Sequence, residues 1–149
     1  MSDATIRPLR AQDEADWRRL WDGYLAFYKT SVSEAVHVAT FARLLGTDAR
    51  DFNGLIAEQD GRVLGLAHYL FHRHCWKIED TCYLQDLYVA PEARGIGLGR
   101  ALIEAVYRAA DAAGAPAVYW LTQDFNTEAR LLYDRIAVLS PFIRYNRVL

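Results

Sequence analysis

The stretch LYVAPEARGIGLGRALIEAVYRAA, residues 87–110, holds three glycines within five positions, between an apolar run and a helix-like run. Gly95, Gly97 and Gly99 leave the backbone without side chains where a helix should begin. A glycine inside a helix or strand costs about 0.5–1 kcal/mol relative to alanine, so three at one junction indicate a local requirement. In this arrangement, backbone N–H groups at a helix N-terminus can converge on phosphate oxygens.

Two familiar phosphate-binding fingerprints are absent from this loop. A dinucleotide-binding G-x-G-x-x-G needs a third glycine at position 100 or 102, where the chain has Arg100 and Leu102. A P-loop needs Gly-Lys-Ser/Thr, which occurs nowhere in the chain. The remaining explanations are a different phosphate-binding loop, or a tight turn with close helix packing.

The composition is that of an ordinary soluble globular protein, with 149 residues, 52% apolar and 24% charged. We expect one domain, residues 1–149. The formal net charge of −2 implies no basic surface and argues against nucleic-acid binding. The start has no secretory apolar region and no run is long enough to span a bilayer, so we expect a cytoplasmic protein with no membrane partner. Cys75 and Cys82 are too few for a disulfide framework.

The hydrophobic periodicity predicts alternating strands and helices. We expect strands at 5–8, 54–71 (a hairpin around Asp60-Gly61), 81–89, 117–122 and 142–149, and helices at 12–28, from the capping box 31–34 to Gly46, 97–113 and 126–137. This order predicts an α/β domain whose early strands are antiparallel. The strands 81–89 and 117–122, joined by a helix, should be parallel neighbours.

The segment RGIGLG, residues 94–99, resembles the pyrophosphate-binding motif of the GNAT superfamily of acyl-CoA-dependent N-acyltransferases, usually written [Gln/Arg]-x-x-Gly-x-[Gly/Ala]. The segment NTEARLLY, residues 126–133, also matches that family's second signature, Asn-x-x-Ala-x-x-x-Tyr. Both look most like the branch containing spermidine/spermine and small-amine or amino-acid acetyltransferases. The resemblance implies the GNAT fold, with a mixed central sheet, antiparallel N-terminal strands, a splayed parallel pair and helices on both faces.

The resemblance also implies that acetyl-CoA is the acyl donor. The backbone amides of residues 95–100 would hold its pyrophosphate, and its pantetheine would lie along strand 81–89 like an added strand, bonded to the backbone of Leu87 and Val89. The implied cofactor-binding residues are Leu87, Tyr88, Val89, Arg94, Gly95, Ile96, Gly97, Leu98, Gly99, Arg100, Asn126, Ala129 and Tyr133.

Acetyl transfer from a thioester to an amine needs a deprotonated amine, a donor to the developing oxyanion and a proton for the departing thiolate. By the resemblance, a backbone N–H near Leu87 is the oxyanion donor and Tyr133 is the general acid. Asn126 and Tyr133 are seven residues apart, about 10.5 Å along a helix, so both can face one cofactor. The alternative for Tyr133 is a core tyrosine beside Leu132.

The general base is where this chain departs from its relatives. The polyamine branch carries glutamate at the position of Gln85, and glutamine cannot accept a proton. Strand alternation places Gln85, Leu87 and Val89 on one face, and Leu84, Asp86 and Tyr88 on the other. A bulge could redirect Asp86 toward a catalytic role, and otherwise Asp86 is a structural carboxylate. Water could also act as the base, or the amine could arrive already neutral.

By the resemblance, acceptor contacts would come from the first two helices and the hairpin, where the family varies most. The candidates are Tyr24, Tyr28, Glu34, His37 and Gln85, although aromatic residues at helical spacing are also typical of a core. His68, His72 and His74, with the two cysteines nearby in sequence, suggest zinc. No recognised ligand spacing is met and the reaction needs no metal, so we expect no metal site.

The sequence therefore predicts an acetyl-CoA-dependent N-acetyltransferase that acts on a primary amine of a small molecule, such as a polyamine or an amino acid, by direct attack in a ternary complex. A protein or peptide N-acetyltransferase and a non-catalytic acyl-CoA-binding domain are the alternatives. Members of this branch often dimerise through their C-terminal strands, so the resemblance also implies a homodimer.

Overall fold

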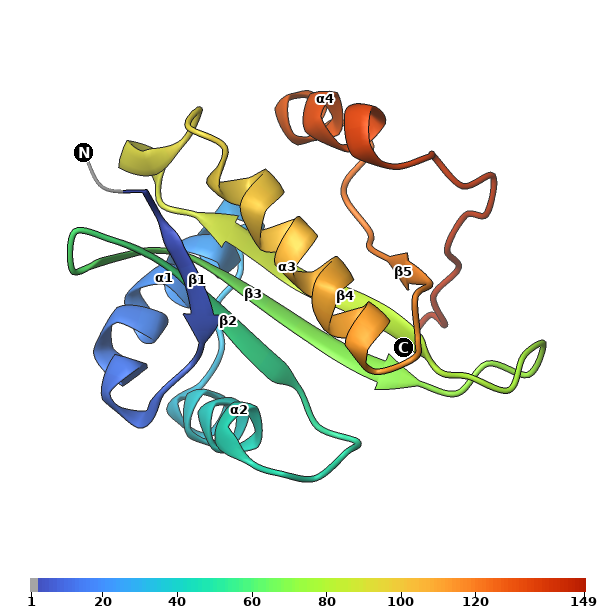
Figure 1. Ribbon diagram of the computed structural model, residues 1–149, viewed down its shortest axis with the longest axis horizontal. Helices are drawn as coiled ribbons and strands as arrows, with labels where there is room; N and C mark the ends of the chain where they lie inside the picture. The colour runs from blue at the N-terminus through green and yellow to red at the C-terminus, as the bar shows by residue number, and fades with distance from the viewer. Residues whose placement is uncertain (1–2) are drawn as a thin grey trace.

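The computed structural model describes residues 3–149 and is built on a five-stranded mixed sheet in the order β1-β2-β3-β4-β5 (Figure 1). The first four strands are antiparallel neighbours, and β5 runs parallel to β4. The strands are β1 (Thr5–Pro8), β2 (Asn53–Gln59), β3 (Arg62–His72), β4 (Thr81–Val89) and β5 (Val118–Tyr119). The helices are α1 (Glu14–Phe27), α2 (Glu34–Leu45), α3 (Leu98–Ala112) and α4 (Thr127–Ile136), with short 3₁₀ turns at Ala11–Asp13 and Pro91–Ala93.

Helices cover both faces of the sheet, and each face has its own apolar core (Figure 1). On one face, α1 and α2 bury Trp17, Leu20 and Phe41 against Ile56 and Leu66. On the other face, α3 buries side chains spaced three or four apart against the sheet: Leu98, Leu102, Ile103, Val106 and Ala110. The mixed α/β fold that the sequence predicts is confirmed.

A β-bulge at Gln85 interrupts the alternation of β4. His68 of β3 pairs with Asp86 and Tyr69 pairs with Leu84, so Gln85 is an extra residue on β4. A bulge shifts the side-chain period by one residue. Leu84 therefore joins Leu87 and Val89 in the core under α3, whereas Tyr88 packs in the core under α1. The predicted grouping of Leu84 with Asp86 and Tyr88 is wrong, and so is that of Gln85 with Leu87 and Val89.

The same bulge determines toward which neighbouring strand each backbone N–H group of β4 is directed. Before it, the Cys82 N–H donates to the carbonyl of Ala117, on the β5 side. After it, the Ala90 N–H donates to the carbonyl of Leu64, on the β3 side. Alternation back from Ala90 turns the N–H groups of Leu87 and Val89 away from β3. Without the extra residue, these groups would face β3.

The strand expected at 117–122 is short. Only Val118 and Tyr119 pair with β4, opposite Cys82 and Tyr83. The chain then leaves the sheet toward α4 (Figure 1), so β4 from Leu84 to Val89 has no β5 partner. The parallel pair is therefore splayed, as the resemblance implies.

The strand expected at 142–149 does not form, and this prediction is wrong. The segment after α4 has no strand partner among residues 3–149, and an isolated extended chain cannot pair its own backbone groups. Its apolar side chains are exposed: Val138, Leu139, Phe142, Ile143, Tyr145, Val148 and Leu149.

Within residues 3–149, none of the helices combines the length and the apolar character that crossing a membrane requires. Both cysteines are free, Cys75 exposed and Cys82 buried.

Candidate functional site

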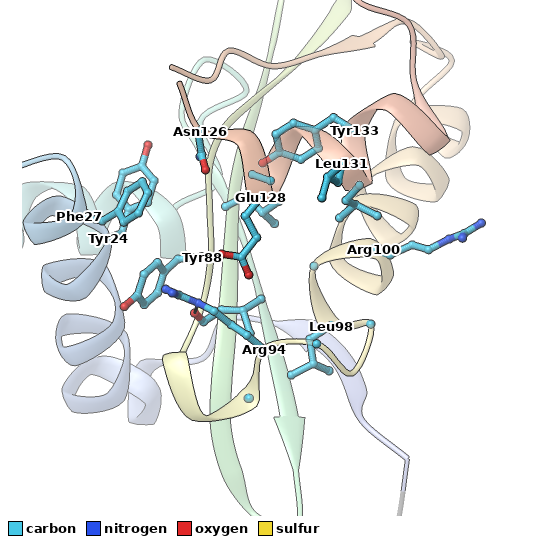
Figure 2. A pocket seen from close by; sticks show the side chains of 18 of the residues that line it. Tyr24, Phe27, Tyr88, Arg94, Leu98, Arg100, Asn126, Glu128, Leu131 and Tyr133 are labelled. Carbon is cyan, nitrogen blue, oxygen red and sulfur yellow. Dashed lines mark hydrogen bonds between the residues drawn. The ribbon is translucent and has the colours of Figure 1, made fainter. Parts of the chain in front are cut away.

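A cavity of about 520 Å³ opens where β4 and β5 diverge, and Figure 2 shows the side chains around it. It is bounded by the outer edge of β4, the end of α1, the glycine loop before α3, and α4. The predicted site residues that line it are Tyr24, Tyr28, Leu87, Tyr88, Val89, Arg94, Gly95, Gly97, Leu98, Gly99, Arg100, Asn126, Ala129 and Tyr133. Segments far apart in the sequence thus meet around one space.

The glycine loop has the conformation that its sequence requires. Gly95 and Gly97 have φ angles of +82° and +89°, in the left-handed region that favours glycine. A Cβ added at either position would meet no atom within 4 Å, so close packing does not explain these glycines. Gly97 is the N-cap of α3 and provides no side-chain cap, which leaves backbone N–H groups of the first turn free for an anion.

Two arginines flank this loop. The Arg94 Nε donates to the carbonyl of Val89 at 3.1 Å, and its guanidinium lies 5.4 Å from the centre of the Tyr88 ring. The Arg100 Nε donates to Glu104 at 2.8 Å. Ile96, by contrast, is exposed and does not line the cavity. The loop therefore presents backbone donors to the opening with Arg94 beside them, whereas the Arg100 guanidinium is paired with Glu104 and points away from the cavity (Figure 2).

Tyr133 projects from α4 toward the cavity (Figure 2). Its ring packs edge-on against Trp120, with the two ring centres 5.4 Å apart. Burial, and to a lesser extent the nearby Tyr28, raises the pKa of Tyr133 to about 12. The phenol is therefore protonated at neutral pH and can donate a hydrogen bond.

Aromatic side chains at the end of α1 face α4 across the cavity (Figure 2). Tyr24 and Tyr28 form what we call the tyrosine wall. The rings of Tyr24 and Tyr28 meet edge-on at 5.0 Å, and Tyr24 also meets Tyr88 edge-on at 6.4 Å. Gly23 makes this approach possible, because a Cβ there would lie 2.7 Å from the Tyr88 hydroxyl. The pKa of Tyr28 is raised mainly by burial and also by the charge of Asp86.

The other residues predicted to contact the acceptor amine do not line the cavity: Glu34, His37 and Gln85. Glu34 forms a salt bridge with Arg18 at 2.6 Å. His37 Nε2 lies 2.7 Å from Asp22, which raises its pKa, and His37 Nδ1 lies 3.0 Å from the carbonyl of Ser33. These contacts hold α1 and α2 together.

Gln85 and Asp86 lie outside the cavity lining for different reasons. Gln85 is the exposed residue of the bulge. Asp86 is buried under α1, where its carboxylate accepts hydrogen bonds from Trp21 of α1 and His68 of β3.

The three histidines near β3 have separate partners. His68 contacts Asp86, His72 lies 2.8 Å from the Tyr119 hydroxyl, and His74 accepts from the backbone N–H of Trp76. Within residues 3–149, no three His, Cys, Asp or Glu side chains are grouped so that they could hold a metal ion.

Six lining residues were missed by the sequence reasoning: Phe27, Ala93, Glu128, Leu131, Leu132 and Arg135. Phe27 directly precedes Tyr28, and Glu128 lies one residue before Ala129. All except Ala93 lie within the helices predicted at 12–28 and 126–137, at positions that the family motifs do not name.

The chain matches the family model described as "Acetyltransferase (GNAT) family" over residues 16–137. The chain belongs to the GNAT acetyltransferase family. It is therefore an acetyltransferase, and its acyl donor is acetyl-CoA.

Two curated relatives share substantial sequence with this acetyltransferase. It is 39% identical over 143 residues to the D-amino-acid N-acetyltransferase HPA3 of Saccharomyces cerevisiae, covering 95% of this chain and 89% of the yeast protein. It is 37% identical over 74 residues to the thialysine N-epsilon-acetyltransferase of Bos taurus, covering 50% of this chain and 43% of the bovine protein.

Solved structures share the fold of this acetyltransferase at lower identity. AAC(6')-Iy, solved in complex with the bisubstrate analogue CoA-S-monomethyl-acetylneamine, superposes with a TM-score of 0.85 at 20% identity, covering 99% of both chains. A second structure of that aminoglycoside N-acetyltransferase contains CoA.

Replacing Gly97 tests the glycine loop. Gly97→Ala places a Cβ at φ +89°, which costs about 1–2 kcal/mol in the left-handed region and would redirect the N–H groups that a pyrophosphate bound at this loop would contact. We expect the Kd for acetyl-CoA, measured by isothermal titration calorimetry, to rise about tenfold or more.

Gly61→Ala is the matched control. Gly61 has a φ of +76° in the β2–β3 turn and does not line the cavity, so this change should strain the backbone similarly and leave the Kd unchanged. Equal Kd values for wild type and Gly97→Ala would contradict a role of the loop in acetyl-CoA binding.

Proposed function

We propose that this acetyltransferase transfers an acetyl group from acetyl-CoA to the primary amine of a small molecule, by direct attack in a ternary complex, and that amino acids are the first acceptors to test. The observation that supports this most is one cavity with the glycine loop and open β4 edge on one side and a wall of tyrosines on the other. The similarity to a D-amino-acid N-acetyltransferase over nearly the whole chain favours an amino-acid acceptor.

The donor site that we propose uses mostly backbone groups. The N–H groups of residues 95–100 bind the pyrophosphate, and Arg94 and Arg100 add positive charge. The outward backbone of Leu87 and Val89 binds the pantetheine along the open edge of β4. Acetyl-CoA bound there supplies an acetyl group activated as a thioester. Tyr88, Leu98, Gly99, Asn126 and Ala129 complete the walls of this site, with Ile96 at its exposed rim.

Two groups act on the reacting atoms. The N–H of Leu87, turned outward by the bulge, donates to the carbonyl oxygen as negative charge develops on it. Tyr133 donates to the departing sulfur. A phenol with a pKa of about 12 is a weaker acid than free tyrosine. Tyr133 therefore stabilises the departing sulfur as a hydrogen-bond donor before it transfers its proton.

The acceptor approaches the wall formed by Tyr24 and Tyr28. Both side chains line the cavity, and an aromatic face attracts an ammonium group. Asp86 does not line the cavity, and its carboxylate accepts hydrogen bonds from Trp21 and His68, so we assign it a structural role.

An acceptor panel tests the activity. Release of CoA should be measured with acetyl-CoA and D-amino acids, L-amino acids, lysine-like amines, polyamines and an amine-bearing peptide. We expect at least one small amine to be acetylated faster than the peptide, with the product identified by mass spectrometry. Binding of CoA without turnover of any amine would favour a non-catalytic acyl-CoA-binding domain, and a preference for the peptide would favour a protein acetyltransferase.

Removing the Tyr133 hydroxyl tests the general acid. Tyr133→Phe should lower kcat by about 100-fold while the Kd for acetyl-CoA stays within about twofold, because the hydroxyl acts in the transition state. Tyr107→Phe is the control, since Tyr107 also packs near Trp120 but does not line the cavity. Wild-type turnover by Tyr133→Phe would remove this hydroxyl from the mechanism.

We also propose that two copies associate through the C-terminal segment 138–149. Its apolar side chains are exposed in the single chain, and Phe142 and Ile143 are 81% and 77% accessible. Such a surface is typical of an interface. Light scattering after size exclusion should give twice the monomer mass of 17.0 kDa, and the double change Phe142→Ser with Ile143→Ser should shift the protein toward the monomer. A monomeric wild type would contradict this association.

A further inference from the structure

A buried hydrogen-bonded pair of side chains joins β3 to β4 directly at the bulge. His68 and Asp86 are partners across the two strands, and the register shifts between His68 and Tyr69. The His68 Nδ1 lies 2.8 Å from the Asp86 Oδ2, and the two residues are 4% and 9% exposed. The pair is therefore the first cross-strand pair after the extra residue Gln85.

The contacts of His68 determine its tautomer. The Trp17 Nε1 lies 2.9 Å from the His68 Nε2, and an indole N–H can only donate. The Nε2 is therefore unprotonated, and the proton of the neutral imidazole is on Nδ1, where it is donated to Asp86. The Trp21 Nε1 donates to the same carboxylate oxygen at 3.3 Å. Two indoles of α1, one helical turn apart, thus contact both members of the pair.

The pair distinguishes the bulged register of β4 from a regular one. In a regular strand, Gln85 would take the place opposite His68, and Asp86 would lie opposite Ala67 on the other face of the sheet. That face is the apolar core under α3, to which Ala67 belongs. A buried carboxylate without hydrogen-bond donors is costly. Asp86 therefore disfavours the regular register and stabilises the bulged one.

The register determines the direction of the N–H groups of Leu87 and Val89. The Ala90 N–H donates to the carbonyl of Leu64, so alternation turns the N–H groups of Leu87 and Val89 away from β3. β5 ends before this part of β4, so no strand of residues 3–149 pairs with them. In the regular register the same two groups would face β3 and form hydrogen bonds with it.

We propose that the pair of His68 and Asp86 holds β4 in the bulged register and so keeps the N–H groups of Leu87 and Val89 directed toward acetyl-CoA. The inference rests on the proposed binding of pantetheine along β4. His68 and Asp86 are positioning residues, because neither lines the cavity and both act through the backbone of β4. The pair acts through its hydrogen bond, so a neutral side chain that keeps the donor or the acceptor keeps the effect.

Amide hydrogen exchange, measured by NMR, tests the register directly. In the wild type, the outward N–H groups of Leu87 and Val89 should exchange at least about tenfold faster than that of Ala90, which is bonded to β3. In Asp86→Leu, the residue at position 86 suits the apolar core under α3, so the regular register becomes accessible. Exchange of Leu87 and Val89 should then slow by about tenfold or more, because β3 pairs with them.

Substitutions of similar volume separate the hydrogen bond from packing. Asp86→Asn keeps a carbonyl oxygen that accepts from His68, and His68→Asn keeps an N–H near the position of Nδ1, whereas leucine at either position keeps neither. The Kd for acetyl-CoA, measured by isothermal titration calorimetry, should rise about tenfold in each Leu variant, the loss expected for two backbone hydrogen bonds. In each Asn variant it should stay within about threefold of wild type. The double Leu variant should lose little more than the worse single variant, because the pair acts as one unit.

Asp13→Leu is the matched control for a general loss of stability. Asp13 is another buried carboxylate, 4% exposed, and it accepts from the Arg7 side chain and the Arg10 backbone N–H, outside β4. This change should lower the melting temperature. It should leave the Kd for acetyl-CoA and the exchange of Leu87 and Val89 unchanged.

The possible outcomes separate the pair from the proposed donor site. Wild-type exchange of Leu87 and Val89 in Asp86→Leu would overturn the role of the pair, and so would equal changes of exchange in Asp86→Asn and Asp86→Leu. Slowed exchange combined with a wild-type Kd would instead overturn the proposed binding of pantetheine by these two N–H groups and leave the role of the pair in the register intact.

Two measurements remain if Asp86→Leu does not fold. His68→Leu and His68→Asn make the same comparison from β3, and equal exchange of Leu87 and Val89 in these two variants would overturn the role of the pair. Nitrogen NMR of histidine-labelled wild type should show His68 protonated on Nδ1 and not on Nε2. The opposite tautomer would overturn the hydrogen bond on which the role of the pair depends.

Discussion

The extra residue at Gln85 is the constraint on which the site depends. A strand without it would turn the N–H groups of Leu87 and Val89 into the sheet, where β3 would pair with them. The bulge releases these donors toward the cavity and at the same time puts Asp86 on the face that α1 covers. One inserted residue thus sets both the direction of the N–H groups of Leu87 and Val89 and the face on which the Asp86 side chain lies.

The bulge has this effect only because β5 stops after Tyr119. A longer β5 would take up the outward N–H groups of β4 in ordinary sheet hydrogen bonds. The chain instead leaves for α4, which brings Tyr133 back over the opening. An unpaired strand edge is normally a liability, and here a bound pantetheine, under the proposed function, would act as the missing strand.

The sequence predicted what local chemistry determines and missed what depends on a neighbouring strand. The glycine loop before α3 and the spacing of Asn126, Ala129 and Tyr133 are local features of the sequence, and Gly95, Gly97, Asn126, Ala129 and Tyr133 line the cavity. The bulge arises from the register between β3 and β4, which a single strand does not encode.

The same distinction between local and tertiary determinants explains the other predictions that the structure does not match. Glu34 and His37 were candidate acceptor contacts by residue type, but ion pairs with Arg18 and Asp22 engage them between α1 and α2. The segment 142–149 has strand-forming composition but no partner strand among the described residues 3–149. Phe27 was missed because its exposure to the cavity depends on where α1 ends. Under the proposed function, backbone groups do most of the binding of acetyl-CoA, so other side chains can be substituted without loss of the loop. On the α1 side of β4, the buried hydrogen bonds of Trp17, His68 and Asp86 depend on one another, so a change at one of these side chains would disturb the other two.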